Sequence, residues 1–269
     1  MTLYIVEIDS GRLKQTRPLT KMMRNDLLLL LLAASLATAA KFSNDPLDGE
    51  SFYAIPRTRA EAEAGTGDNV WVLVEDGTDP YVVFCQPENE RFCPLYDRNG
   101  IVAGMQIGIP FEDIADNSHI YPYETNVLYR KMVRFGRDTW VGTAFFVNIA
   151  VLEAGGRSDL SQGTLEQLWL QYGPSYTDAR QIPLDPATLL STTAFQLENC
   201  VPTMGIHYYY NITEALPCEQ FDPWFMLYEE QQITGIGFQS FGRSVVRPNM
   251  RHYDEEVPLP AVLHKFVSF

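Results

Sequence analysis

The chain has 269 residues, with 20 Lys and Arg against 34 Asp and Glu, and a formal net charge of −14 at neutral pH. This length is enough for one large or two small domains. Binding to nucleic acid or to an anionic membrane requires a basic face, so the acidic balance argues against both partners.

Residues 22–40 have the pattern of a secretory signal peptide. A short basic start leads into a leucine run and then AASLATAA, with an Ala-x-Ala exit. The apolar run is shorter than the ~20 residues that a spanning helix needs, so we expect secretion into the extracellular space and no membrane insertion after signal cleavage. Residues 1–21 precede this signal and are predicted to be a non-native upstream extension. Residues 41–269 keep 15 of the 20 basic and 31 of the 34 acidic side chains, which gives a net charge of −16.

The chain contains four cysteines, and an even number behind a signal peptide indicates disulfides. Three pairings are possible. We favour Cys85–Cys93 and Cys200–Cys218, because the members of each pair are close in sequence and the two pairs are far apart. Neither spacing fits a zinc site, and we expect no metal.

A first β module is predicted over residues 41–118. Apolar runs at 70–74 and 81–84 predict buried strands, and a polar loop follows between Cys85 and Cys93. Asn99-Gly100 lies between apolar runs, which predicts a two-residue hairpin with both turn residues at positive φ. Residues 110–114 predict one helical turn with proline at its first position.

A second β module is predicted over residues 119–269. Its expected elements, in chain order, are a long strand over 140–152, a strand over 165–172, a capped helix over 185–190, a strand over 205–210, a hairpin of 224–228 with 233–238, and a terminal helix over 258–267. Strands dominate. The predicted fold class is therefore mainly β: an antiparallel sandwich or barrel-like sheets with a few short helices, in two modules or one continuous domain.

The two halves share an order of features. Each has a tryptophan strand, then a cysteine-bridged loop, then a hairpin that begins with Leu-Tyr and an acidic residue. A duplication would produce this order, and so would two independent hairpins, since period-2 patterns are common. If the modules are pseudo-repeats, the two hairpins should pack as equivalents.

Few residues carry an indication of chemistry. Asn211 begins an N-x-Thr sequon in a predicted loop, which indicates N-glycosylation of a secreted protein. His207 and Tyr209 share one face of the predicted strand, and with Trp224 they form a candidate ligand pocket. A half-buried histidine with satisfied hydrogen bonds is the simpler interpretation. The sequence contains no nucleophile motif, metal-ligand spacing or cofactor-binding loop, so it predicts no catalytic residue and no cofactor.

Several stretches resemble a family of secreted invertebrate proteins found in molluscs and arthropods. The similar stretches are residues 94–106, 143–156, 164–171, 200–211, 218 and 225–242. Tyr209 stands where that pattern often has tryptophan, and residues 230–232 replace the glycine turn of its second hairpin. The nearest functional label is the insect haemolymph promoting protein, a secreted factor that supports cell growth. The resemblance implies a secreted, disulfide-bonded protein, and it implies no enzyme activity.

The sequence therefore leads to three functional hypotheses. The first is a secreted, glycosylated binding protein or growth-supporting haemolymph-type factor with an extracellular ligand or receptor. The second is an acidic matrix or biomineral-associated protein that binds Ca²⁺, which the net charge of −16 motivates. The third is an enzyme with a site built around His207, and the absence of a catalytic motif argues against it.

Overall fold

The computed structural model describes residues 52–114, 121–161, 163–201, 205–241, 245 and 247, and the backbone of strands at 2–7, 41–43 and 255–256. The side chains of residues 52, 201 and 218 are outside this description. The predicted signal peptide and the predicted terminal helix over 258–267 also lie outside the described residues.

The described chain is mainly β, as predicted, and its strands form two antiparallel sheets that are not closed into a barrel. Sheet I has the strand order β11-β10-β9-β7-β6-β5-β4, with β8 paired to β9. Its strands are β4 (Val72–Glu75), β5 (Tyr81–Cys85), β6 (Cys93–Asp97), β7 (Val102–Pro110), β8 (Arg130–Arg134), β9 (Arg137–Phe145), β10 (Leu168–Gln171) and β11 (Ala179–Ile182).

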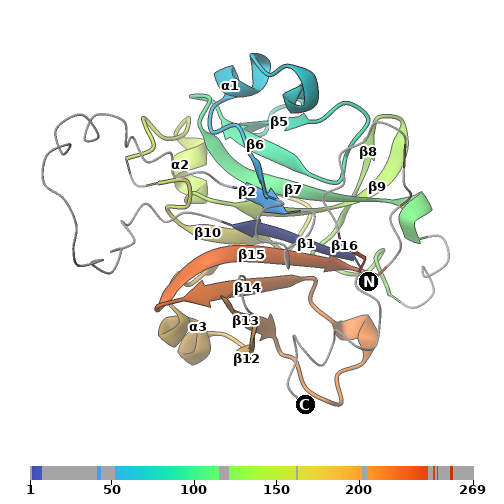
Figure 1. Cartoon of the computed structure of the whole chain (residues 1–269), viewed down its shortest axis with the longest axis vertical. Helices are drawn as coiled ribbons and strands as arrows, with labels where there is room; N and C mark the ends of the chain where they lie inside the picture. The colour runs from blue at the N-terminus through green and yellow to red at the C-terminus, as the bar shows by residue number, and fades with distance from the viewer. Residues whose placement is uncertain are drawn as a thin grey trace, which may run out of the picture.

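Sheet II has the order β12-β13-β14-β15-β1-β2-β3, with β16 paired to β1. Its strands are β1 (Thr2–Glu7), β2 (Lys41–Ser43), β3 (Phe52–Ala54), β12 (Phe195–Val201), β13 (Gly205–Tyr210), β14 (Trp224–Glu229), β15 (Gln232–Ser240) and β16 (Glu255–Glu256). Figure 1 shows β1, in dark blue, lying along β15, in orange. A strand from the predicted upstream extension thus pairs with a strand from the far end of the chain.

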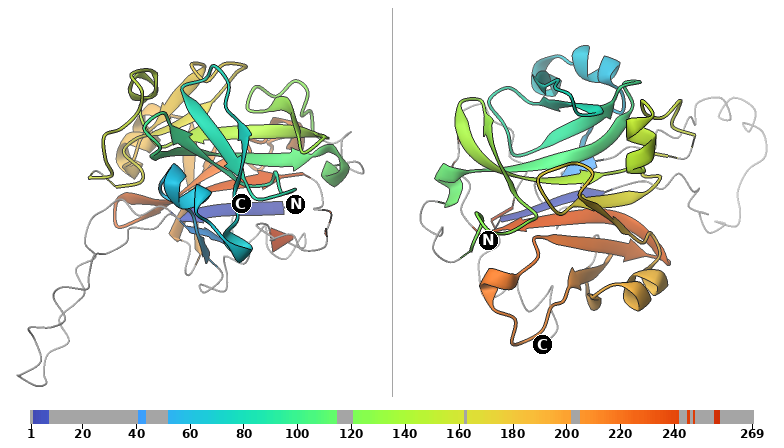
Figure 2. Two further views of the ribbon diagram at one scale, coloured as in Figure 1. Left: turned by 90° about the horizontal axis from the view of Figure 1, so that it is seen from above. Right: turned by 180° about the vertical axis from the view of Figure 1, so that it is seen from behind.

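The main hydrophobic core lies between the two sheets. In the view from above in Figure 2, the green and yellow strands of sheet I form one layer, and the blue and orange strands of sheet II form the other. Phe84 and Met105 of sheet I pack in one cluster with Trp224, Met226 and Phe238 of sheet II. Burial of each such large side chain contributes roughly 1.5–3 kcal/mol.

A second core lies on the outer face of sheet I. Because strand side chains alternate, Val82 and Phe84 point into the main core, whereas Tyr81 and Val83 belong to the second. Leu152 of helix α2 packs there. The helices of the described residues are α1 (Arg59–Glu63), α2 (Ile149–Glu153) and α3 (Pro186–Thr192), with 3-10 turns η1 (Gly67–Asn69), η2 (Phe111–Ile114) and η3 (Cys218–Gln220).

Three local predictions need correction. The helical turn predicted over 110–114 begins at Phe111, because Pro110 is the last residue of β7. The strand predicted over 140–152 ends at Phe145, because Asn148 accepts a hydrogen bond from the backbone N–H of Ala150 and caps α2. At the first hairpin only Gly100 has positive φ, at 80°. The backbone N–H of Gly100 donates to the carbonyl of Asp97, so the turn is of the three-residue type with a glycine bulge.

The predicted boundary between the two modules does not separate the sheets. Strand β7 precedes residue 118 and pairs along seven residues with β9, which follows it. The two predicted hairpins are present, β6–β7 in sheet I and β14–β15 in sheet II. The capped helix predicted over 185–190 is α3, with the Asp185 side chain accepting from the N–H of Thr188.

Candidate functional site

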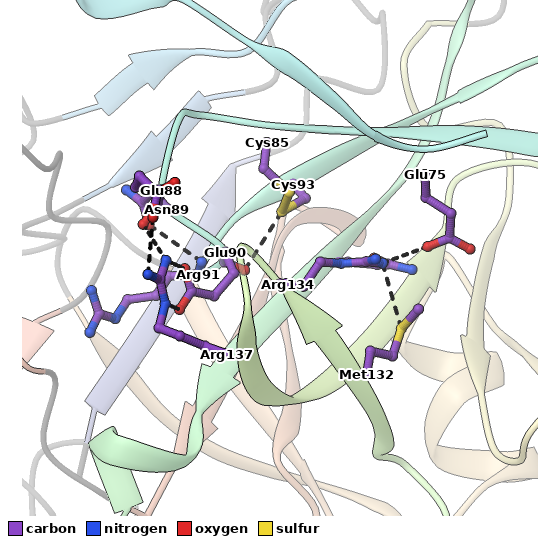
Figure 3. Close-up of a disulfide and its surroundings, with 11 residues drawn as sticks. Glu75, Cys85, Glu88, Asn89, Glu90, Arg91, Cys93, Met132, Arg134 and Arg137 are labelled. Carbon is purple, nitrogen blue, oxygen red and sulfur yellow. Dashed lines mark hydrogen bonds and ion pairs between the residues drawn. A yellow bond between two sulfur atoms is a disulfide. The ribbon is translucent and has the colours of Figure 1, made fainter.

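The predicted disulfide between Cys85 and Cys93 is present, and it joins the end of β5 to the start of β6 (Figure 3). The loop between the two cysteines is polar in sequence but largely buried in the structure. Its Asn89, Glu90 and Arg91 side chains are each about 1% exposed. A buried charge is tolerated when it is paired and hydrogen-bonded, so the partners of these residues determine where the loop lies.

Glu90 is held by Arg137 at the start of β9 (Figure 3). The guanidinium donates through Nε to one carboxylate oxygen at 2.8 Å and through Nη2 to the other at 2.7 Å. A bidentate pair of this kind fixes orientation as well as distance. The hydrogen bonds from Arg137 to Glu90 raise the pKa of the guanidinium, which therefore stays charged.

Arg91 connects the loop to η2. Its Nε and Nη2 donate to the two carboxylate oxygens of Asp113 at 2.9 and 2.8 Å. The backbone of Val245 completes this clamp, because its N–H donates to Asp113 and its carbonyl accepts from Arg91. The disulfide loop thus fixes η2, the turn that follows β7.

A pocket of about 400 Å³ opens beside η2. Its lining comes from η2, from the segment before β8, and from β9: Phe111, Ile114, Tyr121, Pro122, Tyr123, Glu124, Thr125 and Trp140. This volume lies within the range of small-molecule sites in proteins. Four of these eight described residues are aromatic, and Glu124 is the one charged side chain among them.

Two tyrosines of the lining are fixed through their hydroxyl groups. The Tyr121 hydroxyl donates to the carbonyl of Phe221 at 2.6 Å, and the Tyr123 hydroxyl donates to the carbonyl of Phe241 at 2.9 Å. Burial raises the pKa of both hydroxyls, so they remain protonated donors. Phe221 lies just before β14 and Phe241 follows β15 directly. These hydrogen bonds therefore connect the pocket wall to sheet II.

The aromatic rings of the wall stack on one another. Phe111 stacks on Trp140 with centroids 5.1 Å apart, and Tyr123 stacks on Trp140 at 6.2 Å. Lys131 of β8 lies over the Phe111 ring, with its Nζ 4.7 Å from the centroid. Stacked rings of this kind stabilise one arrangement, so the pocket is formed before any ligand enters.

The segment before β8 is a tight turn. The carbonyl of Pro122 accepts from the N–H groups of both Thr125 and Asn126, and the Asn126 side chain donates to the Tyr121 hydroxyl at 2.7 Å. Glu124 and Thr125 are exposed at the rim of the pocket. This turn therefore presents a carboxylate beside an aromatic interior.

The candidate pocket predicted at His207, Tyr209 and Trp224 lies elsewhere and is closed. All three side chains are buried in sheet II and none lines the pocket beside η2. His207 stacks on Tyr209 and Phe225, and burial lowers its pKa from 6.5 to about 4. A neutral, buried imidazole has no access to a substrate, so the structure offers no support for an enzyme built around His207.

The second predicted disulfide is not formed at Cys200, which is a free, exposed thiol at the outer strand β12. The side chain of Cys218 lies outside the described residues. Cys200 of β12 pairs with Ile206 of β13, and Ile206 pairs with Tyr228 near the end of β14. The chain from η3 enters β14 at Trp224, four residues or roughly 13 Å along the strand from that position. Closeness in sequence therefore did not place the two cysteines together.

Asn211 is exposed at the end of β13 with a φ of 50°.

The described part of the chain contains no cluster of three His, Cys, Asp or Glu side chains able to hold a metal ion. None of its helices is long and apolar enough to cross a membrane.

Sequence reasoning missed the pocket because its walls come from three separate segments. The signal that was available is the aromatic and proline-rich YPY at residues 121–123, together with Phe111 after a proline. Comparison of the chain with protein-family models, with curated proteins and with solved structures finds no match.

Proposed function

We propose that this chain is a secreted, disulfide-bonded binding protein whose ligand site is the aromatic pocket beside η2. The observation that carries the proposal is the fixed aromatic wall of Phe111, Tyr123 and Trp140 around a space of about 400 Å³. A preformed pocket needs little reorganisation when a ligand enters, which favours binding. The resemblance to secreted invertebrate proteins and the haemolymph factor agrees with such a role.

The binding test uses a neutral aromatic probe, 2-phenylethanol, with isothermal titration calorimetry. Wild-type protein should bind it at a single saturable site. Thr125→Trp should abolish binding, because a large side chain at the rim fills the pocket without disturbing the buried wall. Thr177→Trp is the matched control, since Thr177 is exposed and lies outside the pocket lining. Binding that survives Thr125→Trp, or no binding by any of the three proteins, overturns the proposed site.

Secretion is tested separately by expression of the full chain in a secretory host. The signal peptide predicts a secreted product that begins at residue 41, and the sequon predicts a product that loses mass on treatment with an N-glycosidase. Asn211→Gln should remove that change in mass. Signal cleavage before residue 41 would also remove β1 from sheet II. One molecule therefore cannot both lose the signal peptide and keep β1 paired with β15. A secreted product that retains residues 1–7 overturns the signal peptide.

A further inference from the structure

We infer that the pocket selects ligands that combine an aromatic or aliphatic body with a cationic amine, such as an aralkyl ammonium ion. This inference rests on the proposed binding function and specifies the chemical class of the ligand. It follows from the hydrogen-bonding state of the lining residues and from the position of Glu124, the one carboxylate among the described lining residues.

The hydroxyl groups of the described pocket lining are already engaged. The hydroxyls of Tyr121 and Tyr123 donate to backbone carbonyls of the opposite sheet, and the Thr125 hydroxyl lies 3.4 Å from the carbonyl of Pro122. A sugar or another polyol needs several convergent hydrogen-bonding partners, and the hydroxyl groups of the described wall are already occupied. The interior therefore suits an apolar ligand body in contact with the rings.

Glu124 then determines what the polar end of the ligand should be. Its side chain is exposed at the rim, and the other seven described lining residues carry no charge at neutral pH. A carboxylate beside an apolar pocket attracts a cationic group and repels an anionic one. The net charge of −14 adds a long-range attraction for cationic ligands.

The aromatic wall already contacts one ammonium group of the protein. Lys131 Nζ lies over the Phe111 ring at 4.7 Å, a cation–π contact within the usual range. Asp138 pairs with the same Nζ at 3.1 Å, which balances the Lys131 charge and reduces its repulsion of a ligand amine. The surroundings of the pocket are thus compatible with a second cation at Glu124.

The test compares two probes of the same skeleton, 2-phenylethylamine and 2-phenylethanol, by calorimetry at neutral pH. Wild-type protein should bind the amine about fivefold more tightly than the alcohol, as expected for one partly exposed carboxylate–ammonium pair. Glu124→Gln should reduce this preference to less than twofold and leave the affinity for the alcohol unchanged. High salt should reduce the preference in wild-type protein in the same way, because salt screens exposed charges.

Glu214→Gln is the matched control, because it removes one exposed negative charge away from the pocket. It should keep the fivefold preference, which separates the local effect of Glu124 from the overall charge. Equal binding of amine and alcohol, or a preference that Glu124→Gln does not change, overturns the cationic ligand class and leaves the pocket intact. Failure of both probes to bind overturns the proposed function itself.

Discussion

Arg91 connects the disulfide loop to the turn that forms the pocket, and its replacement by methionine tests this arrangement. The side chains of Arg91 and Asp113 are 1% and 4% exposed, so neither charge is solvated in the folded protein. Removal of one partner leaves the other charge buried without its ion-pair partner, which typically costs about 3–5 kcal/mol. We therefore expect Arg91→Met to lower the free energy of unfolding by about this amount.

Urea unfolding, followed by tryptophan fluorescence, measures the effect. With a urea dependence of about 2–3 kcal/mol per molar, the midpoint should fall by roughly 1–2 M. Arg59→Met is the matched control, because Arg59 forms an exposed ion pair with Glu63 on α1 at 2.7 Å. Loss of an exposed pair four residues apart on a helix should cost only about 0.3–0.5 kcal/mol.

A double variant separates the ion pair from general packing. In Arg91→Met/Asp113→Leu neither charge remains, so the double variant should be more stable than the sum of the two single effects predicts, by at least about 1 kcal/mol. Strictly additive single effects would refute the pairing argument. So would a cost of Arg91→Met no greater than that of Arg59→Met.

Three further predictions concern stability. Replacement of Cys85 and Cys93 by serine should cost about 2–3 kcal/mol in urea unfolding, as the chain-entropy model gives for cysteines eight residues apart. Gln231→Gly should stabilise the protein by roughly 1 kcal/mol, because Gln231 holds a φ of 67° that glycine adopts without strain, and an unchanged thermal midpoint would contradict this. Burial raises the pKa of Asp222 from 3.8 to about 7, so its protonated form favours the fold below pH 4 and this contribution is lost as the pH rises to about 7. The free energy of unfolding of Asp222→Asn should therefore exceed that of wild type by an amount that grows from about pH 4 to about pH 7, up to about 4 kcal/mol. The same pH dependence of stability in both proteins would contradict this prediction. His207 acts in the opposite sense, because its pKa is lowered to about 4 and its contribution is lost as the pH falls from about 6.5.

Short apolar and aromatic runs were sufficient to predict much of the fold. The strands over 81–84 and 205–210 and the hairpin at 229–232 are present because their apolar positions must face one of two cores. The strand predicted over 140–152 was too long, because composition alone cannot show where a side chain such as Asn148 turns the backbone into a helix. Residue propensity therefore predicted which strands are present better than it predicted where they end.

Contacts between distant segments could not be predicted in the same way. The pairing of Cys85 with Cys93 follows from two adjacent antiparallel strands, whereas Cys200 lies on a strand that runs away from the segment containing Cys218. The pocket depends on hydroxyl bonds from Tyr121 and Tyr123 to residues about 100 positions away. No local pattern encodes such a separation.

The structure also changes the meaning of the polar loop between Cys85 and Cys93. In the sequence it resembles a solvated connection, yet Glu90 and Arg91 are buried and each is matched by a bidentate partner. The disulfide joins the two ends of the loop, and the Glu90–Arg137 pair holds the loop against β9. The Arg91–Asp113 pair holds η2 against the same loop. Two walls of the pocket, Trp140 on β9 and Phe111 on η2, are therefore positioned by one loop. Reduction of the disulfide should therefore weaken the affinity for 2-phenylethanol even under conditions in which the protein remains folded.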